Sequence, residues 1–207
     1  MPPLVTVITP TWNRPEQLFN RCIPSVAAQT YPNIEHVVVH DGPFDDEFKD
    51  RFLRCDAPGF RRLISLDEHD PNPHWGGPAR RFGLERSEGE FVTYLDDDDA
   101  FRPDHVRLLA EQLINDPVLG WTYSRMVSHQ PSGDYVIGDC VPPVYGQIGS
   151  PMLMHRRQIT ASVASWGAPD AAEDWKLVEL WIASGIKYGH VHEDTVDVWP
   201  SAYAALE

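Results

Sequence analysis

Cysteine is scarce in this chain, with three residues among 207. Cys22, Cys55 and Cys140 are odd in number and widely spaced, and no CxxC pair is present. This pattern excludes a disulfide framework and a zinc site built on paired thiolates. A chain of this length buries about 70% of the surface that its unfolded form exposes, so a core can form without cross-links. We expect reduced, buried thiols.

Long apolar runs are also absent. No stretch approaches the ~20 apolar residues that span a bilayer, and the N-terminus has no basic segment followed by a signal-type apolar stretch. The sequence therefore predicts a cytoplasmic protein without a transmembrane segment. With 42% hydrophobic and 23% charged residues, the composition is that of a globular protein. We find no internal repeat and no linker that would divide residues 1–207 into two domains.

Positive charge is in short supply. The chain has 17 Lys and Arg against 31 Asp and Glu, a formal net charge of −14. Nucleic-acid surfaces need basic residues to neutralise phosphates, so this balance argues against a nucleic-acid partner. Arginines are concentrated at 51–62 and 80–86. That concentration fits either a phosphate-binding strip or a solvated helix face.

Carboxylates, by contrast, are gathered at one point. Four consecutive aspartates, Asp96 to Asp99, end a short β-type run at 91–95. Like charges this close raise one another's pKa and repel, so the cluster needs a cation. Oxygen-rich sites suit Mg²⁺ or Mn²⁺, and the carboxyl ends of strands are where open α/β sheets bind ligands. A solvated acidic turn is the alternative interpretation.

Strand-type and helix-type segments alternate in the first part of the chain. Strands are expected at 4–9, 34–40, 62–66 and 91–95, and helices at 18–26, 77–88 and 103–115. Pro24 should kink or shorten the first helix, because it cannot donate to the carbonyl of Asn20. The alternation predicts an α/β fold with a mainly parallel central sheet flanked by helices.

The remainder of the chain is less regular. Runs at 121–128 and 135–137 predict a hairpin, a small antiparallel addition to the sheet, and the Pro/Gly-rich stretch 139–151 predicts a loop. A helix at 172–184, stopped by Gly185, and one or two strands at 188–199 complete the expected elements.

The chain resembles the family-2 glycosyltransferases of the GT-A fold in three segments: VTVITPTWNRPEQLFNRCIPSVAAQTYPNIEHVVVHDGPFDD, GGPARRFGLERSEGEFVTYLDDDDAFRPDHV and EDWKLVELWIASG. The resemblance implies a single domain with a Rossmann-like, nucleotide-diphospho-sugar transferase fold. Residues 1–100 would be its nucleotide-binding half and 101–207 its acceptor-binding half. It also implies an inverting enzyme that uses Mn²⁺ or Mg²⁺ and moves a sugar from a UDP- or GDP-linked donor to an unidentified acceptor.

By this resemblance the aspartates contain a DxD motif. Asp96 and Asp98 are the expected metal ligands, with Asp98 the stronger candidate for direct coordination, and Asp97 is placed to contact the ribose. A divalent ion would act as a Lewis acid on the diphosphate leaving group. His190 and His192, on one face of an expected strand, are further possible ligands; solvent-facing histidines on an edge strand are the alternative.

The same resemblance assigns the nucleotide site. Five residues match the segment that lies beneath the nucleotide, where an aromatic ring can stack on the base: Pro10, Thr11, Trp12, Asn13 and Arg14. Asn13, among them, is equally suited to contact the nucleotide or to cap the following helix. Arg80 falls where the family carries Ala-Arg-Asn-x-Gly near the donor phosphates, and a guanidinium fork fits phosphate oxygens. Arg81 replaces the usual Asn.

Asp41 matches the aspartate that binds the base in this family. An ionised carboxylate accepts hydrogen bonds, so it suits the imide N–H of uracil or the N1–H and amino group of guanine. Its alternative role is to cap the turn before Gly42. The acidic residue that usually precedes this aspartate is His40 here.

The expected catalytic base belongs to the third segment, where Glu173-Asp174 matches the family's Glu-Asp motif. Asp174 would share one helix face with Leu177 and Trp181 and remove the acceptor's proton. A charge that stabilises the helix N-terminus is the alternative. Trp166, in the preceding loop, is expected to face the acceptor.

Two other functions are compatible with an acidic α/β site. A nucleotidyltransferase typically opens with a Gly-rich, basic phosphate loop, and residues 10–15 contain no glycine. A non-catalytic nucleotide-sugar or glycan-binding module would keep Asp41 without needing Asp98 or Asp174, and both are present. The sequence therefore favours catalysis.

Overall fold

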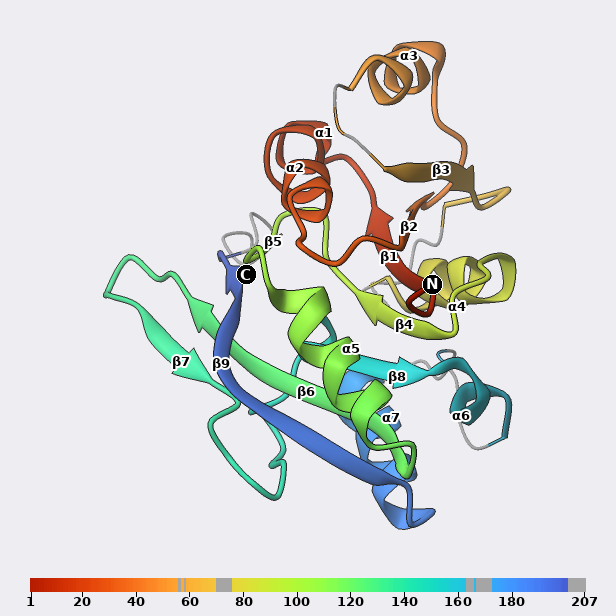
Figure 1. Cartoon of the computed structure of the whole chain (residues 1–207). Coiled ribbons are helices and arrows are strands. Elements are labelled where there is room, and N and C mark those ends of the chain that lie inside the picture. The colour runs from red at the N-terminus through yellow and green to blue at the C-terminus, as the bar shows by residue number, and fades with distance from the viewer. Residues whose placement is uncertain (56, 58, 70–75, 163–165, 167–172, 201–207) are drawn as a thin grey trace.

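The computed structural model describes residues 1–55, 57, 59–69, 76–162, 166 and 173–200. In these residues nine strands form one mixed sheet of order β3-β2-β1-β4-β8-β6-β9-β5, and β7 pairs with β6 off this path (Figure 1). The sheet thus has a parallel part and a second part with antiparallel additions, as the sequence predicts.

The first part of the sheet is wholly parallel. It consists of β1 (Val5–Thr11), β2 (Ile34–His40), β3 (Phe60–Ser65) and β4 (Phe91–Tyr94). Every residue of β1 and β4 is buried. Parallel strands covered on both faces are nearly continuous apolar runs in the sequence, which is why these strands could be predicted.

The second part adds strands in both directions. Its strands are β5 (Ala100–Phe101), β6 (Leu119–Ser128), β7 (Tyr135–Ile137), β8 (Leu153–Arg156) and β9 (Lys187–Val198). β8 lies antiparallel between β4 and β6, β9 runs parallel to β6, and β5 pairs antiparallel with β9. The predicted hairpin is confirmed as β6 and β7. β5 and β8 were not predicted.

Helices cover both faces of the sheet (Figure 1). One face carries α1 (Pro15–Gln17), α2 (Ile23–Ala27), α3 (Asp46–Arg54) and α5 (His105–Asn115). The other face carries α4 (Gly77–Arg86), α6 (Arg157–Ser162) and α7 (Glu173–Ala183). A short 3₁₀ turn, Ser150–Met152, precedes β8. The expected helix start at Ala172 lies outside the described residues.

The irregularity expected at Pro24 is confirmed. A π-helical turn, Leu18–Cys22, joins α1 to α2, and the Ile23 N–H donates to the Leu18 carbonyl. This register is one residue longer than that of an α-helix. Pro24 then lies in the first turn of α2, a position in which proline is tolerated.

The sheet separates two apolar clusters. One contains Leu18, Phe52 and Leu109 from the helices of the first face, and the other contains Leu84, Leu177 and Trp181 from the second. The three cysteines are free, as expected, although only Cys22 is fully buried. Among the described residues, no helix combines the length and apolarity needed to cross a bilayer.

Gly89 is fixed where α4 leads into β4. A Cβ on this residue would lie 2.5 Å from the backbone nitrogen of Thr6. We expect Gly89→Ala to lower the free energy of unfolding by about 1–3 kcal/mol, because backbone must move to relieve the overlap. The exposed Glu88→Ala, one residue away, should change it by less than about 0.5 kcal/mol. Urea unfolding of both variants tests this, and equal stabilities would contradict the expectation.

Candidate functional site

The four aspartates lie at the carboxyl end of the parallel strands, as predicted. The Leu95 N–H donates to the Ile8 carbonyl at 3.0 Å, which continues the β1–β4 ladder up to Asp96. The β1–β2 register ends with Thr11 opposite His40. The ends of β1, β2 and β4 therefore bring Thr11, Asp41 and the aspartates to one edge of the sheet.

Asp97 is the buried centre of the cluster, with none of its side chain exposed. The Thr11 hydroxyl donates to its Oδ2 at 2.7 Å, and Arg14 Nη2 lies 2.8 Å from its Oδ1. The other nitrogen of the same guanidinium, Nη1, lies 2.5 Å from Asp98 Oδ2. Arg14 therefore neutralises two neighbouring carboxylates at once.

Further contacts hold the flanking aspartates. Arg80, which is 4% exposed, forms an ion pair with Asp96 from the first turns of α4. Arg21 Nη1 donates to the Asp98 carbonyl at 2.5 Å, and its guanidinium lies 3.8 Å from the centre of the Trp199 ring. The Trp199 N–H donates to Asp99 Oδ1 at 3.2 Å. Sequence reasoning missed Arg21 and Trp199, since nothing local distinguishes them.

Burial raises the pKa of three of the four carboxyl groups. It raises the pKa of Asp97 to about 7, against the opposing effects of Arg14 and the Thr11 hydroxyl. It also raises the pKa of Asp98, and that of Asp99 well above its usual value, with nearby carboxylates adding to the effect. The cluster therefore holds protons more tightly than free aspartates do. A cation that binds these oxygens must displace protons or arginines.

The expected metal ligands suit a hard divalent ion. Asp96 and Asp98 keep 31% and 13% of their side chains exposed, so their oxygens are reachable from solvent. Among the described residues, no three His, Cys, Asp or Glu side chains are arranged to hold a metal ion. One or two carboxylates completed by phosphate oxygens and water are typical of Mg²⁺ sites. Of the two histidines named as further possible ligands, His190 stacks on Tyr123 with ring centroids 4.4 Å apart, and His192 is exposed.

The residues expected to hold the base also lie together. The rings of Trp12 and His69 are stacked, with centroids 3.9 Å apart and planes 7° apart. His69 Nδ1 lies 3.0 Å from Asp41 Oδ2. Asn13 has a positive φ of 54°, and the N-cap of α1 is Arg14 without a side-chain cap. Asn13 is therefore not the helix cap. No motif in the sequence marks His69 as a site residue.

Asp174 lies in the first turn of α7, as predicted. Burial raises its pKa, and the Trp175 N–H, which donates at 2.7 Å, opposes that effect, as does Arg80. Asp96 adds to the increase in pKa, so Asp174 lies within electrostatic reach of the aspartate cluster. The Glu173 side chain lies outside the described residues.

The expectation that Trp166 faces the acceptor is wrong. The Trp166 ring is 2% exposed, packs edge-on against Tyr94 with centroids 5.0 Å apart, and lies 5.0 Å from the Arg80 guanidinium carbon. Its place before the Glu-Asp motif suggested a surface role, whereas the ring fills the core beneath Arg80. It supports a site residue and does not face a ligand.

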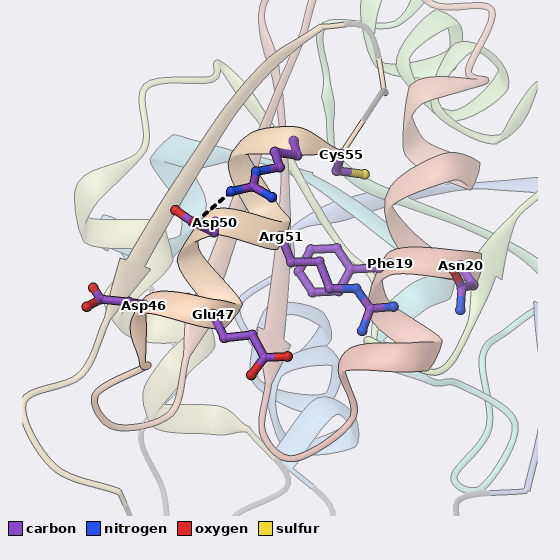
Figure 2. Close-up of a pocket in the computed structure, with 8 residues that line it drawn as sticks. Phe19, Asn20, Asp46, Glu47, Asp50, Arg51 and Cys55 are labelled. Atoms are coloured by element: carbon purple, nitrogen blue, oxygen red, sulfur yellow. Dashed lines mark hydrogen bonds and ion pairs between the residues drawn. The ribbon is translucent and has the colours of Figure 1, made fainter.

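A separate hollow of about 640 Å³ lies between α3 and the Leu18–Cys22 turn (Figure 2). Its lining pairs carboxylates with arginines, including Asp50 with Arg54 at 2.9 Å. None of the expected site residues line it. The hollow therefore supplies no component of the candidate site.

The mixed sheet, with aspartates gathered at the carboxyl ends of its parallel strands, has the GT-A fold. The chain matches Glycosyl transferase family 2 over residues 6–174, and it belongs to that family. It is 29% identical to the glycosyltransferase GlyA of Streptococcus pneumoniae over 172 residues. The matched region covers 79% of this chain and 24% of GlyA. GlyG of the same organism is 30% identical over 115 residues, covering 55% of this chain and 36% of GlyG. The chain thus spans about a quarter to a third of these relatives.

Solved structures show the same fold. TarS of S. aureus in complex with UDP superposes with a TM-score of 0.73 at 17% identity, covering 96% of this chain and 61% of that structure. The mannosyltransferase PcManGT of Pyrobaculum calidifontis, in complex with GDP-Man and Mn²⁺, gives 0.70 at 17% identity, covering 96% and 57%. The expected GT-A fold is confirmed.

The raised pKa of Asp97 predicts a pH-dependent stability. Its carboxyl has a pKa of about 7 in the folded protein and about 3.8 in the unfolded chain, so between these values the folded state binds more protons. Stability must then fall as pH rises through that window. The free energy of unfolding of the unsubstituted chain should fall between pH 4 and pH 7, whereas that of Asp97→Asn should not. We therefore expect the difference between the two to shift in favour of Asp97→Asn by at least about 1 kcal/mol over this range. Metal-free urea unfolding measures this, and a difference that does not vary with pH would contradict it.

Proposed function

We propose that this chain is a metal-dependent, inverting glycosyltransferase that takes a sugar from a UDP- or GDP-linked donor. The observation that carries the proposal is the meeting of the aspartate cluster, Arg80 and Asp174 at one edge of the sheet. Residues 1–100 would bind the nucleotide and residues 101–207 the acceptor, which the chain does not identify. Family membership supports this reading over a nucleotidyltransferase.

Donor binding would use contacts already grouped at the strand ends. Trp12 offers a ring for stacking on the base, and Asp41 an acceptor for a base N–H. Arg80, held at the start of α4, offers a guanidinium fork to the diphosphate. The low exposure of Arg80 strengthens its interaction with phosphate, because little solvent screens the charge. Pro10 packs beneath Gly76 and shapes the floor of this region.

Asp96 and Asp98 would hold the divalent ion. When bound, the ion supplies Lewis-acid neutralisation of the diphosphate leaving group. The Mn²⁺ recorded with GDP-Man in the mannosyltransferase structure supports this choice of cation. Arg14 already bridges Asp97 and Asp98, so its guanidinium would turn toward the donor as the carboxylates take up the ion. Asp97 would then be oriented by Thr11 toward the ribose.

Asp174 would act as the general base. Its carboxylate would remove the proton of the acceptor hydroxyl while that oxygen attacks the anomeric carbon and the bond to the diphosphate breaks. Attack opposite the leaving group inverts the anomeric centre. Burial raises the pKa of Asp174, which makes its carboxylate a stronger base than an exposed aspartate. The rate should therefore fall as pH drops through that raised pKa.

Asp98 tests the metal assignment. We expect Asp98→Asn to remain folded but to lose metal-dependent binding of UDP or GDP by tenfold or more, on the order of other losses around metal ligands. Calorimetric titration with and without Mn²⁺ measures the effect. The exposed Asp50→Asn, in the separate hollow, is the matched control and should bind as the unsubstituted chain does. Undiminished Mn²⁺ dependence in Asp98→Asn would remove Asp98 from the ligand set.

Asp174 separates binding from chemistry. We expect Asp174→Asn to keep donor affinity while kcat falls by roughly 10² to 10⁴. Glu179→Gln, an exposed substitution on the same helix, is the control. If Asp174 only stabilises the helix N-terminus, its loss would instead cost about 0.3–1 kcal/mol of stability with near-normal turnover. Unfolding and single-turnover measurements on the two variants distinguish these roles.

A further inference from the structure

The imidazole of His69 makes two contacts at the expected base subsite. It stacks on Trp12 with ring centroids 3.9 Å apart and an angle of 7° between the planes. Its Nδ1 also lies 3.0 Å from a carboxylate oxygen of Asp41. These are the two side chains that the proposed function gives to the base. One planar ring from the segment after β3 therefore engages both.

These contacts are the ones that a nucleotide base would make. A base would stack on an aromatic ring through its flat face and donate an N–H from its edge to an ionised carboxylate. A flat imidazole that donates Nδ1–H does the same. Trp12 and Asp41 cannot make both sets of contacts with His69 and with a base in the same place.

The backbone around His69 fixes this arrangement. Gly42 has a φ of 96°, and a Cβ there would lie 2.9 Å from the His69 backbone nitrogen. Only glycine lets the two segments approach so closely. His40 Nδ1 lies 2.8 Å from the Gly42 carbonyl, and the His40 ring meets Trp12 at a centroid distance of 5.5 Å. The turn after β2 thus places His69 directly over Trp12.

The His69 side chain is nevertheless free to leave. It is 38% exposed, and the Asp41 side chain is 19% exposed, so both reach solvent. Rotation of the His69 side chain, without movement of the packed backbone, would end both its stacking on Trp12 and its contact with Asp41 Oδ2. The stacked imidazole and an incoming base would then exchange at one position.

We propose that His69 is a base-subsite residue that sets donor affinity by occupying the place of the base, and that the base binds by displacing it. The inference rests on the proposed function, because it requires a nucleotide at Trp12 and Asp41. Displacement lowers the apparent affinity by the fraction of molecules in which the subsite is open. That factor is the same for every base, since it belongs to the protein alone.

Nucleotide affinity of a His69 variant tests the proposal. We expect His69→Ala to bind UDP and CDP with Mn²⁺ about five- to tenfold more tightly than the unsubstituted chain, by the same factor for both. KM for the donor should fall by a similar factor while kcat does not rise. His69→Asn, which loses the stack but keeps an N–H donor, should tighten binding less. Calorimetric titration gives these dissociation constants without requiring an acceptor.

A second histidine provides the control. His129 stacks on Trp199 with centroids 4.9 Å apart, and its Nε2 lies 3.0 Å from Asp197. His129→Ala therefore removes the same kind of ring from the same kind of neighbours, outside the base subsite. Its nucleotide affinities should stay within about twofold of the unsubstituted chain, because no base displaces that ring.

Asp41 supplies an independent readout. With His69 present, Asp41→Ala removes a contact of the base and also an anchor of its competitor, so the two losses partly cancel. We expect Asp41→Ala to weaken UDP binding more in the His69→Ala background than alone, a coupling that a double-mutant cycle measures. If His69 only holds Asp41 in place, the coupling has the opposite sign, and Asp41→Ala weakens UDP binding less in the His69→Ala background.

The binding measurements distinguish failure of the displacement proposal from failure of the proposed glycosyltransferase function. If the unsubstituted chain binds UDP and both His69 variants bind it equally or more weakly, the displacement proposal is overturned and the nucleotide site stands. If neither the unsubstituted chain nor any His69 variant binds a nucleotide with Mn²⁺, the proposed function and this inference fail together.

Discussion

The buried like charges of the aspartate cluster are the constraint on which the rest of the site depends. A carboxylate as buried as Asp97 is unstable unless cations and hydrogen bonds compensate it. Arg14 on the loop after β1 compensates Asp97, Arg80 on α4 pairs with Asp96, and the backbone N–H of Trp199 after β9 donates to Asp99. Segments from the beginning, middle and end of the chain are thus tied to the end of one strand.

The fold was predictable where one element carries its own signal. β1, β2 and β4 are buried on both faces, so the hydrophobic effect alone demands continuous apolar runs, and these are visible in the sequence. β5 has only two residues, and β8 follows two apolar residues with His155 and Arg156, so neither shows the apolar run that marks β4. Their strand character comes from pairing with β4 and β9, which only the assembled sheet supplies. α3 did carry a signal, an N-cap at Asp45, that the sequence reading overlooked.

The site residues, like the strands, were predictable only where the local sequence marks them. The aspartates, Thr11 and Arg80 stand beside recognisable strand and helix boundaries, and the structure places them together. Arg21 reaches Asp98 across 77 residues and His69 reaches Asp41 across 28, and neither contact follows from local spacing. Trp166 shows the opposite failure, since a loop position suggested exposure while tertiary packing buries the ring. Contacts between segments far apart in the sequence therefore explain why Arg21 and His69 were missed and why the expectation for Trp166 was wrong.

The arginines explain how a chain of net charge −14 can receive an anionic donor. Arg14 pairs with Asp97 and Asp98, and Arg80 pairs with Asp96, so an arriving diphosphate and divalent cation would exchange partners with existing ion pairs. Phosphate oxygens would replace carboxylates at the guanidinium groups, and the metal would replace guanidinium groups at the carboxylates. The divalent cation would offset the charge that the diphosphate brings, so these carboxylates and guanidinium groups would all remain paired; a buried charge left unpaired would cost several kcal/mol. The displacement proposed for His69 would extend the same principle to the base, since its ring stacks on Trp12 and contacts Asp41, and a base would take over both contacts.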